Sequence, residues 1–368
     1  MAHALPADVM KLLFDEFQGE GTAIGPCRLV CKAWLPASRT RIFAVVDLKE
    51  RSIQSFLDVV QTSSFPIKNF IRTLRLIVRQ QDTFFQGAAE NIKDLGPFPN
   101  ATTLTVKANI SIWIPTLADT FFPHNFPRLS NLNISLSDYT TMSMHDILAA
   151  ITPFPTLESL KLNVNGQGFA FLDGSVPEVY RIPPRLHTLH FEMAMAPNFL
   201  ELLFEMEDND EIELPAFTTL SMQDSWPQER SFLGRYLRSF GHKMQHLRVD
   251  CSSDNMFDVP GALRYCTALR SLELHLDTSK VSGALLFIAN YLDSPALTAI
   301  KVIDPDQRTG RSLSRHADKW QKLDQVLSEE RFTGLDSLSF TFSRGLTERL
   351  REGMPLCAAR GILRVLDA

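Results

Sequence analysis

A short phrase recurs along this chain: an apolar residue, two mostly polar residues, an apolar residue, one exposed residue and a further apolar residue. Clear copies begin at Leu129, Leu157, Leu186 and Leu269. The middle apolar residue returns about every 29 residues, and a fixed period of 20 to 50 residues is the signature of a repeat architecture. These middle residues are Leu74, Leu104, Leu132, Leu160, Leu189, Leu220, Leu247, Leu272, Ile300, Leu338 and Leu363.

Helix-period segments separate the copies of the phrase. Ile53, Phe56, Leu57 and Val60 follow the i, i+3, i+4, i+7 spacing of an amphipathic helix with one buried stripe. Similar stripes occur at 147–151 and 285–292. Alternating strands and helices of this period predict an α/β fold, a curved leucine-rich-repeat solenoid of about ten repeats over residues 49–368, with parallel strands on its concave face.

The alternation of side chains along a strand predicts which residues face outward from the sheet. The apolar residues of each phrase point into the core, so the residues beside them line the concave face. Their mixed charges suit a polar protein segment better than an apolar ligand. The predicted substrate-binding residues are Lys161, His190, Glu192, Gln223, Arg248, Asp250, Glu273, His275 and Lys301, and Arg75, Lys107 and Asn133 extend the same face.

Composition restricts the classes of partner and compartment. The formal net charge of -5 gives no global attraction to nucleic acid or to anionic membranes. The five cysteines are too few and too scattered for a disulfide scaffold, which favours a reducing compartment. The acidic residues near the N-terminus do not fit a signal peptide, and no long apolar segment occurs. We therefore expect a soluble protein of the cytoplasm, the nucleus or both.

Residues 1–48 do not carry the repeat and form a separate N-terminal head. An amphipathic helix opened by Pro6 runs to about Phe17, a second apolar helix contains Cys27 to Trp34, and a third lies near Ala37 to Phe43. Three helices of this length cannot bury all their apolar faces alone. We expect the head to pack against the repeats, against a partner or against both.

The head resembles the F-box family, in its Leu5-Pro6 start with Val9 downstream and in the segment from Val30 to Trp34. The whole plan, a head of this kind followed by irregular leucine-rich repeats, is similar to the expanded F-box family of mushroom-forming fungi. The resemblance implies a substrate-receptor subunit of an SCF-type cullin-RING ubiquitin ligase, which binds a Skp-type adaptor through the head and a protein substrate through the repeats. Carried over by position, the adaptor contacts are Leu5, Pro6, Val9, Val30 and Trp34.

Two alternatives remain open. Trp34 and its neighbours can instead be core residues that hold the three helices together. The chain can also be a non-catalytic leucine-rich-repeat scaffold whose head binds a different protein partner.

Motifs of catalysis, cofactor binding and metal binding are weak in this sequence. No Gly-x-Ser-x-Gly, His-Glu-x-x-His or phosphate-loop spacing occurs. The acidic run from Glu205 to Glu213 fails as a calcium loop, because Ile212 stands where an oxygen ligand is needed. The basic run Arg308, Arg311, Arg315 and Lys319 lacks interleaved aromatic residues. We expect no enzymatic activity, no cofactor, no metal and no nucleic-acid partner.

Overall fold

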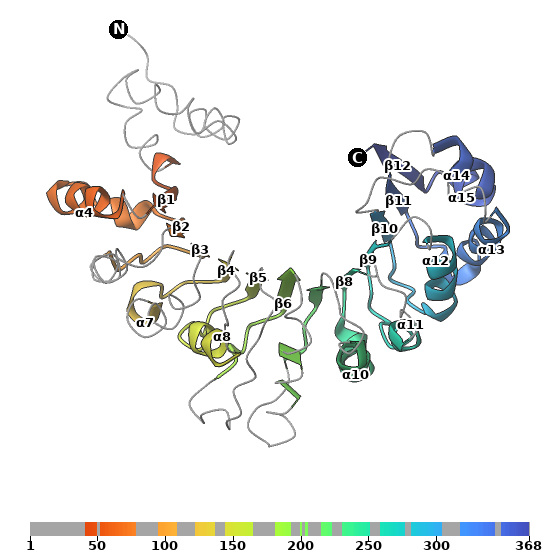
Figure 1. Cartoon of the computed structure of the whole chain (residues 1–368), viewed down its shortest axis with the longest axis horizontal. Coiled ribbons are helices and arrows are strands. Elements are labelled where there is room, and N and C mark those ends of the chain that lie inside the picture. The colour runs from red at the N-terminus through yellow and green to blue at the C-terminus, as the bar shows by residue number, and fades with distance from the viewer. Residues whose placement is uncertain are drawn as a thin grey trace, which may run out of the picture. The chain divides into compact units, whose positions relative to one another are not determined.

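The structure is a computed structural model (Figure 1). It describes residues 41–49, 52–78, 95–108, 122–136, 144–164, 181–192, 199–200, 203–204, 215–222, 230–250, 258–276, 281–303, 317–342 and 347–367. The chain divides into two compact units, one of residues 1–158 with 168–185 and the other of residues 159–167 with 186–368. The first forty residues, which hold nearly all of the predicted three-helix head, lie outside the described ranges.

The first unit contains four described strands that pair in parallel and in chain order: β1 (Val45–Lys49), β2 (Thr73–Val78), β3 (Thr103–Ala108) and β4 (Asn131–Leu136). Leu74 lies opposite Leu104, and Leu104 lies opposite Leu132, which confirms the predicted register. Strand β1 was not predicted, although Val46 pairs with Leu74 in the same register. Its phrase consists of Phe43, Val46 and Leu48 and lies inside residues 1–48, so the repeat sheet begins within the segment that the sequence assigned to the head.

Helical segments return the chain between strands of the first unit. They are α4 (Ile53–Thr62), the 3-10 helix η2 (Ile67–Phe70), α7 (Phe122–Asn125) and α8 (Met144–Ile151). Helix α4 buries Ile53 and Leu57, and α8 buries Ile147 and Leu148, as their spacing predicted. Pairs of stacked phenylalanines continue this core, with ring centroids 5.4 Å apart for Phe98 and Phe126.

The second unit contains eight described strands in chain order: β5 (Ser159–Val164), β6 (Thr188–Glu192), β7 (Thr219–Met222), β8 (His246–Asp250), β9 (Ser271–His275), β10 (Ala299–Ile303), β11 (Ser337–Phe342) and β12 (Leu363–Asp367). All neighbouring pairs are parallel. The predicted middle residues align at each step, from Leu160 opposite Leu189 to Leu338 opposite Leu363. The α/β class and the parallel repeat sheet are therefore confirmed.

Helices cover one side of this second sheet. They are α10 (Arg230–Phe240), α11 (Asp258–Leu263), α12 (Val281–Tyr291), α13 (Ala317–Leu327), α14 (Thr347–Gly353) and α15 (Pro355–Ala359), with the 3-10 helices η4 (Gly241–Lys243) and η6 (Glu330–Phe332). Figure 1 shows α10 to α15 on one side of strands β8 to β12. We call the opposite side, which no described helix of this unit covers, the open face.

The leucines of each phrase fill the space between sheet and helices. Leu189, Leu220 and Leu338 are fully buried, and burying such a side chain contributes roughly 1.5 to 3 kcal/mol. Larger rings complete the layer, including the edge-to-face pair of Trp320 and Phe340, whose centroids lie 5.8 Å apart. Apolar packing of this kind fixes the stacking of repeats and turns the alternate strand residues onto the open face.

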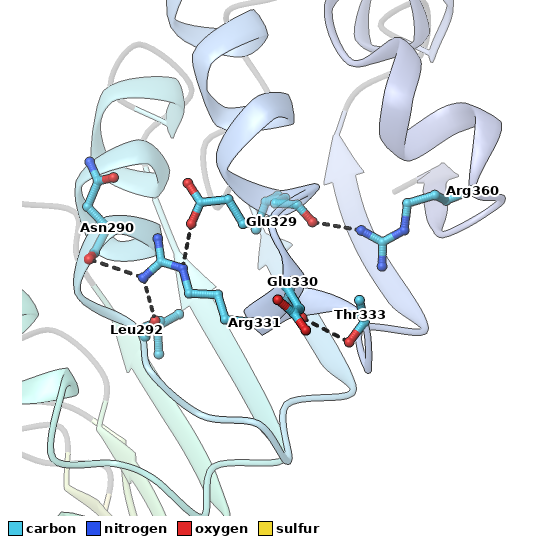
Figure 2. Close-up of polar contacts among 8 residues, drawn as sticks. Asn290, Leu292, Glu329, Glu330, Arg331, Thr333 and Arg360 are labelled. Atoms are coloured by element: carbon cyan, nitrogen blue, oxygen red, sulfur yellow. Dashed lines mark hydrogen bonds and ion pairs between the residues drawn. The ribbon is translucent and has the colours of Figure 1, made fainter.

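Arginine side chains tie neighbouring repeats together at the ends of the helices (Figure 2). Arg331 donates from Nη1 to the carbonyl of Leu292 at 3.0 Å and from Nε to the Glu329 carboxylate at 2.8 Å. Arg360 donates to the carbonyls of Leu327 at 2.7 Å and Phe332 at 2.8 Å. These bonds satisfy carbonyl groups that the helix and turn ends leave without a partner.

Candidate functional site

Four of the predicted substrate-binding residues meet on the open face of strands β8 to β10. Arg248, Glu273 and Lys301 occupy the same register position on the three adjacent strands. His275 follows Glu273 by two residues on β9, so both side chains point to the same side. We call these residues the charge cluster.

Glu273 is the centre of the charge cluster. Its Oε1 lies 3.1 Å from His275 Nε2 and 3.1 Å from Arg248 Nε, and its Oε2 lies 3.2 Å from Lys301 Nζ. The His275 contact is a hydrogen bond, in which the ring nitrogen donates to the carboxylate. The Arg248 contact is an ion pair without the alignment of a hydrogen bond. One carboxylate therefore serves three partners from three strands.

The environment keeps Glu273 ionised. The hydrogen bond from His275 is the largest cause that lowers the pKa of this carboxyl from 4.5 to about 2. The hydrogen bond from Lys301 and the charges of Lys301 and Arg248 lower the pKa further, whereas partial burial opposes them. Two permanent cations thus share one carboxylate, and the cluster has a surplus of positive charge at neutral pH.

Ser221 lies beside the charge cluster on β7, directly opposite Arg248. Its side chain is 4% exposed, and its Oγ has no hydrogen-bond partner among the described residues. A buried hydroxyl without a partner costs about 1 to 3 kcal/mol. The hydroxyl makes no hydrogen bond to a described base of the kind that activates a serine nucleophile, and it adds a polar group to the surface beside Arg248.

The other predicted substrate-binding residues are described only in part. Lys161 on β5 and His190 on β6 are register partners, and both are half-buried. Glu192 ends β6 and Asp250 ends β8, but their side chains lie outside what the structure describes, as does the whole of Gln223. The predicted adaptor contacts Leu5, Pro6, Val9, Val30 and Trp34 also lie outside the described residues.

The structure adds open-face residues that the sequence analysis passed over. Ser337, Ser339 and Thr341 alternate along β11, and we call them the hydroxyl lane. Arg364 on β12 lies opposite Ser339. The alternation that predicts Lys301 on the open face also predicts these positions, but serine and threonine have no charge that marks them as binding residues in the sequence.

Metal-binding clusters and membrane-spanning helices are absent from the part of the chain that the structure describes. The described residues hold no group of three or more His, Cys, Asp or Glu side chains that could bind a metal ion. Among them, no helix is both long and apolar enough to span a bilayer.

Known proteins give one weak structural match to this chain and no match to its sequence. No family model matches the chain, and no curated protein matches it. Among solved structures, the chain is similar to the crystal structure of a protein from Bacteroides fragilis determined by a structural genomics consortium, with a TM-score of 0.42 and 10% sequence identity. That match covers 88% of this chain and 73% of the other. At this TM-score the likeness supports no conclusion about function, which must come from the residues themselves.

Proposed function

We propose that this chain is a non-catalytic substrate receptor of an SCF-type cullin-RING ubiquitin ligase. The head would bind a Skp-type adaptor through Leu5, Pro6, Val9, Val30 and Trp34, and the open face would hold a protein substrate. Holding a substrate near a charged conjugating enzyme supplies proximity and orientation, while the bond chemistry takes place on other subunits. The chain would then work wherever such ligases act, in the cytoplasm, the nucleus or both.

The observation that carries the substrate half of this proposal is the charge cluster on the open face. Arg248, Glu273 and Lys301 are held at defined positions by three adjacent strands, and Lys301 keeps 42% of its side chain exposed. Fixed charges on an extended sheet favour recognition of a protein segment, because charge pattern provides specificity and speeds association. The adaptor half rests on the resemblance of the head to the F-box family.

The decisive test is co-purification of the full chain with a Skp-type adaptor. Changing Trp34→Ala should reduce adaptor recovery by about thirtyfold, since truncating an interface tryptophan costs about 2 kcal/mol or more. The matched control is Tyr291→Ala, which truncates a partly exposed aromatic residue in α12. It should leave adaptor recovery unchanged.

Two results would oppose the proposal. Full adaptor recovery with the Trp34 variant would remove that residue from the interface. Failure of the unaltered chain to bind any Skp-type adaptor would instead favour a repeat scaffold whose head binds another protein. Circular dichroism of each variant, compared with the unaltered chain, distinguishes lost binding from lost folding.

A further inference from the structure

The hydroxyl lane is bordered by two cations. Lys301 on β10 and Arg364 on β12 both lie opposite Ser339, the middle residue of the lane. The lane residues Ser337, Ser339 and Thr341 are half-buried, and none of their hydroxyls donates to or accepts from another described residue. Three accessible donors therefore line a strip that has a positive charge on each side.

The open-face positions of β10 to β12 contain these two cations and no acid. The positions are Ala299, Lys301, Ile303, Ser337, Ser339, Thr341, Arg364 and Leu366. Lys301 reaches Glu273 on its far side, and Arg364 is exposed without a described partner. Glu273 offsets one positive charge, but Arg248, Lys301 and Arg364 together leave this part of the open face with a surplus of positive charge, which complements an anionic group.

The spacing allows both cations to contact a single anionic group. Neighbouring strands lie about 4.8 Å apart, so the backbones of Lys301 and Arg364 are separated by roughly 10 Å. Arg364 is exposed and long enough to cover half of that distance, and Lys301 can cover the other half when its ammonium turns from Glu273 Oε2, 3.2 Å away on the β9 side, toward β11. A carboxylate above Ser339 can then accept from the serine hydroxyl, the ammonium and the guanidinium together.

Apolar side chains lie on either side of the hydroxyl lane two residues further along the strands. Ile303 follows Lys301 by two residues, and Leu366 follows Arg364 by two residues, with Thr341 between them. Leu366 is 48% exposed. An extended segment lying along β11 would place alternate side chains about 6.6 Å apart on one face. This spacing equals the step from Lys301 to Ile303 and from Arg364 to Leu366.

We propose that the hydroxyl lane receives an acidic segment of a protein substrate, with a carboxylate between Lys301 and Arg364 and an apolar side chain two residues away between Ile303 and Leu366. The inference rests on the proposed function and names the chemistry of its substrate. Two cations and two aliphatic side chains suit an acidic peptide better than a nucleic acid, which needs stacking aromatic residues that the described open face of β10 to β12 lacks.

The test uses a labelled nine-residue peptide in which glutamate and leucine stand two positions apart, with fluorescence anisotropy of the full chain. The double variant Lys301→Glu with Arg364→Glu should weaken binding by at least about tenfold, because both attractions become repulsions. The matched control is Arg238→Glu with Lys243→Glu, which changes the net charge equally at exposed residues near the end of α10 and in η4. It should change binding less than about twofold.

Single substitutions at Ser339 still test the inference if the double variant fails to fold. Changing Ser339→Ala should weaken binding about three- to tenfold through loss of a hydrogen bond to a charged group. Changing Ser339→Glu should abolish binding, since it places a carboxylate in the anion position. Thermal unfolding followed by circular dichroism confirms that each variant is folded.

Three outcomes would overturn the inference. They are equal binding of a peptide with glutamine in place of glutamate, equal weakening by the control double variant, and preference for a phosphorylated serine peptide or for oligouridylate over the glutamate peptide. Recovery of the Skp-type adaptor distinguishes failure of this inference from failure of the proposed function. The Lys301, Arg364 and Ser339 variants should still bind the adaptor. If the chain binds the peptide but no Skp-type adaptor, the peptide site in the hydroxyl lane is supported and the ligase role is contradicted.

Discussion

Glu273 illustrates how a single carboxylate can organise a surface made of separate repeats. It draws Arg248 and Lys301 from the strands on either side and His275 from its own strand. The side chains of Arg248 and Glu273 are 28% and 25% exposed, so solvent screens the pair less than it screens a fully exposed one. We therefore expect this network to contribute both charge pattern and stability.

The pH dependence of that contribution can be predicted. The folded-state pKa of Glu273, about 2, is below its ordinary value of 4.5, so the stabilisation is complete above pH 4.5 and is lost as pH falls toward 2. Changing Glu273→Gln should reduce the free energy of unfolding by about 1 to 2 kcal/mol at pH 7, after allowance for partial exposure. Urea unfolding across this pH range should show the difference between variant and unaltered chain narrowing.

Glu348 provides the control for this measurement. It pairs with Arg351 at 2.9 Å, but its side chain is 78% exposed. Changing Glu348→Gln should alter the free energy of unfolding by less than about 0.5 kcal/mol. Equal effects of the two substitutions, or a Glu273 effect that does not depend on pH, would contradict the assigned role of the charge cluster.

Burial makes the thiols of Cys266 and Cys357 unreactive. Burial raises the pKa of Cys266 to about 12, and it raises the pKa of Cys357, where the neighbouring Asp324 carboxylate acts in the same direction. Both residues therefore stay protonated at physiological pH and pack as small apolar side chains.

At the scale of elements, a buried carboxylate links two helices of the second unit. Asp324 on α13 is 2% exposed, and its two oxygens accept from the backbone amides of Leu356 and Cys357, each at 2.8 Å. Those amides belong to the first turn of α15, where no earlier carbonyl can satisfy them. Asp324 thus acts as an N-terminal cap supplied by a different helix.

Replacing this cap should be costly. Asp324→Asn keeps one acceptor oxygen but presents a donor to the second amide, so we expect a loss of about 2 to 3 kcal/mol in the free energy of unfolding. Asp318→Asn, an exposed position in the first turn of the same helix, should cost less than about 1 kcal/mol. Urea unfolding of both variants measures the difference, and a small Asp324 effect would show that the two hydrogen bonds contribute little.

At the scale of the whole molecule, stability follows the nearest-neighbour order of the repeats. Each interior strand of a unit contacts one strand on either side, whereas β12, the last described strand, contacts only β11 among the described strands. In such arrays, stability is close to a sum of repeat terms and interface terms. An interior leucine is therefore covered from two sides, whereas a leucine of the terminal strand is covered from one.

This order predicts different costs for the same substitution. Leu272→Ala in β9 removes a side chain that is 1% exposed and should cost about 3 to 4 kcal/mol. Leu363→Ala in the half-buried terminal strand should cost about 1 kcal/mol, because less apolar area is lost. Similar costs in urea unfolding would argue against nearest-neighbour stabilisation of this unit.

The strand register of this protein can be read from its amino-acid sequence without coordinates. The phrase has a period of two within each strand and about 29 residues between strands, so the core leucines and the open-face positions could be assigned without coordinates. That is why Arg248, Glu273 and Lys301 were predicted for one face and are neighbours on it. Strand β1 was missed because its phrase, Phe43, Val46 and Leu48, lies inside residues 1–48, which were assigned to the head, and has valine in place of the middle leucine.

The contacts between side chains, in contrast, depend on three-dimensional packing that the repeat pattern does not specify. The donation from His275 to Glu273, the burial of Ser221 and the capping of α15 by Asp324 all depend on side-chain conformation and on helix positions that no repeat spacing encodes. The register follows from a local periodic pattern, whereas these contacts require packing between residues brought together by the stacked repeats.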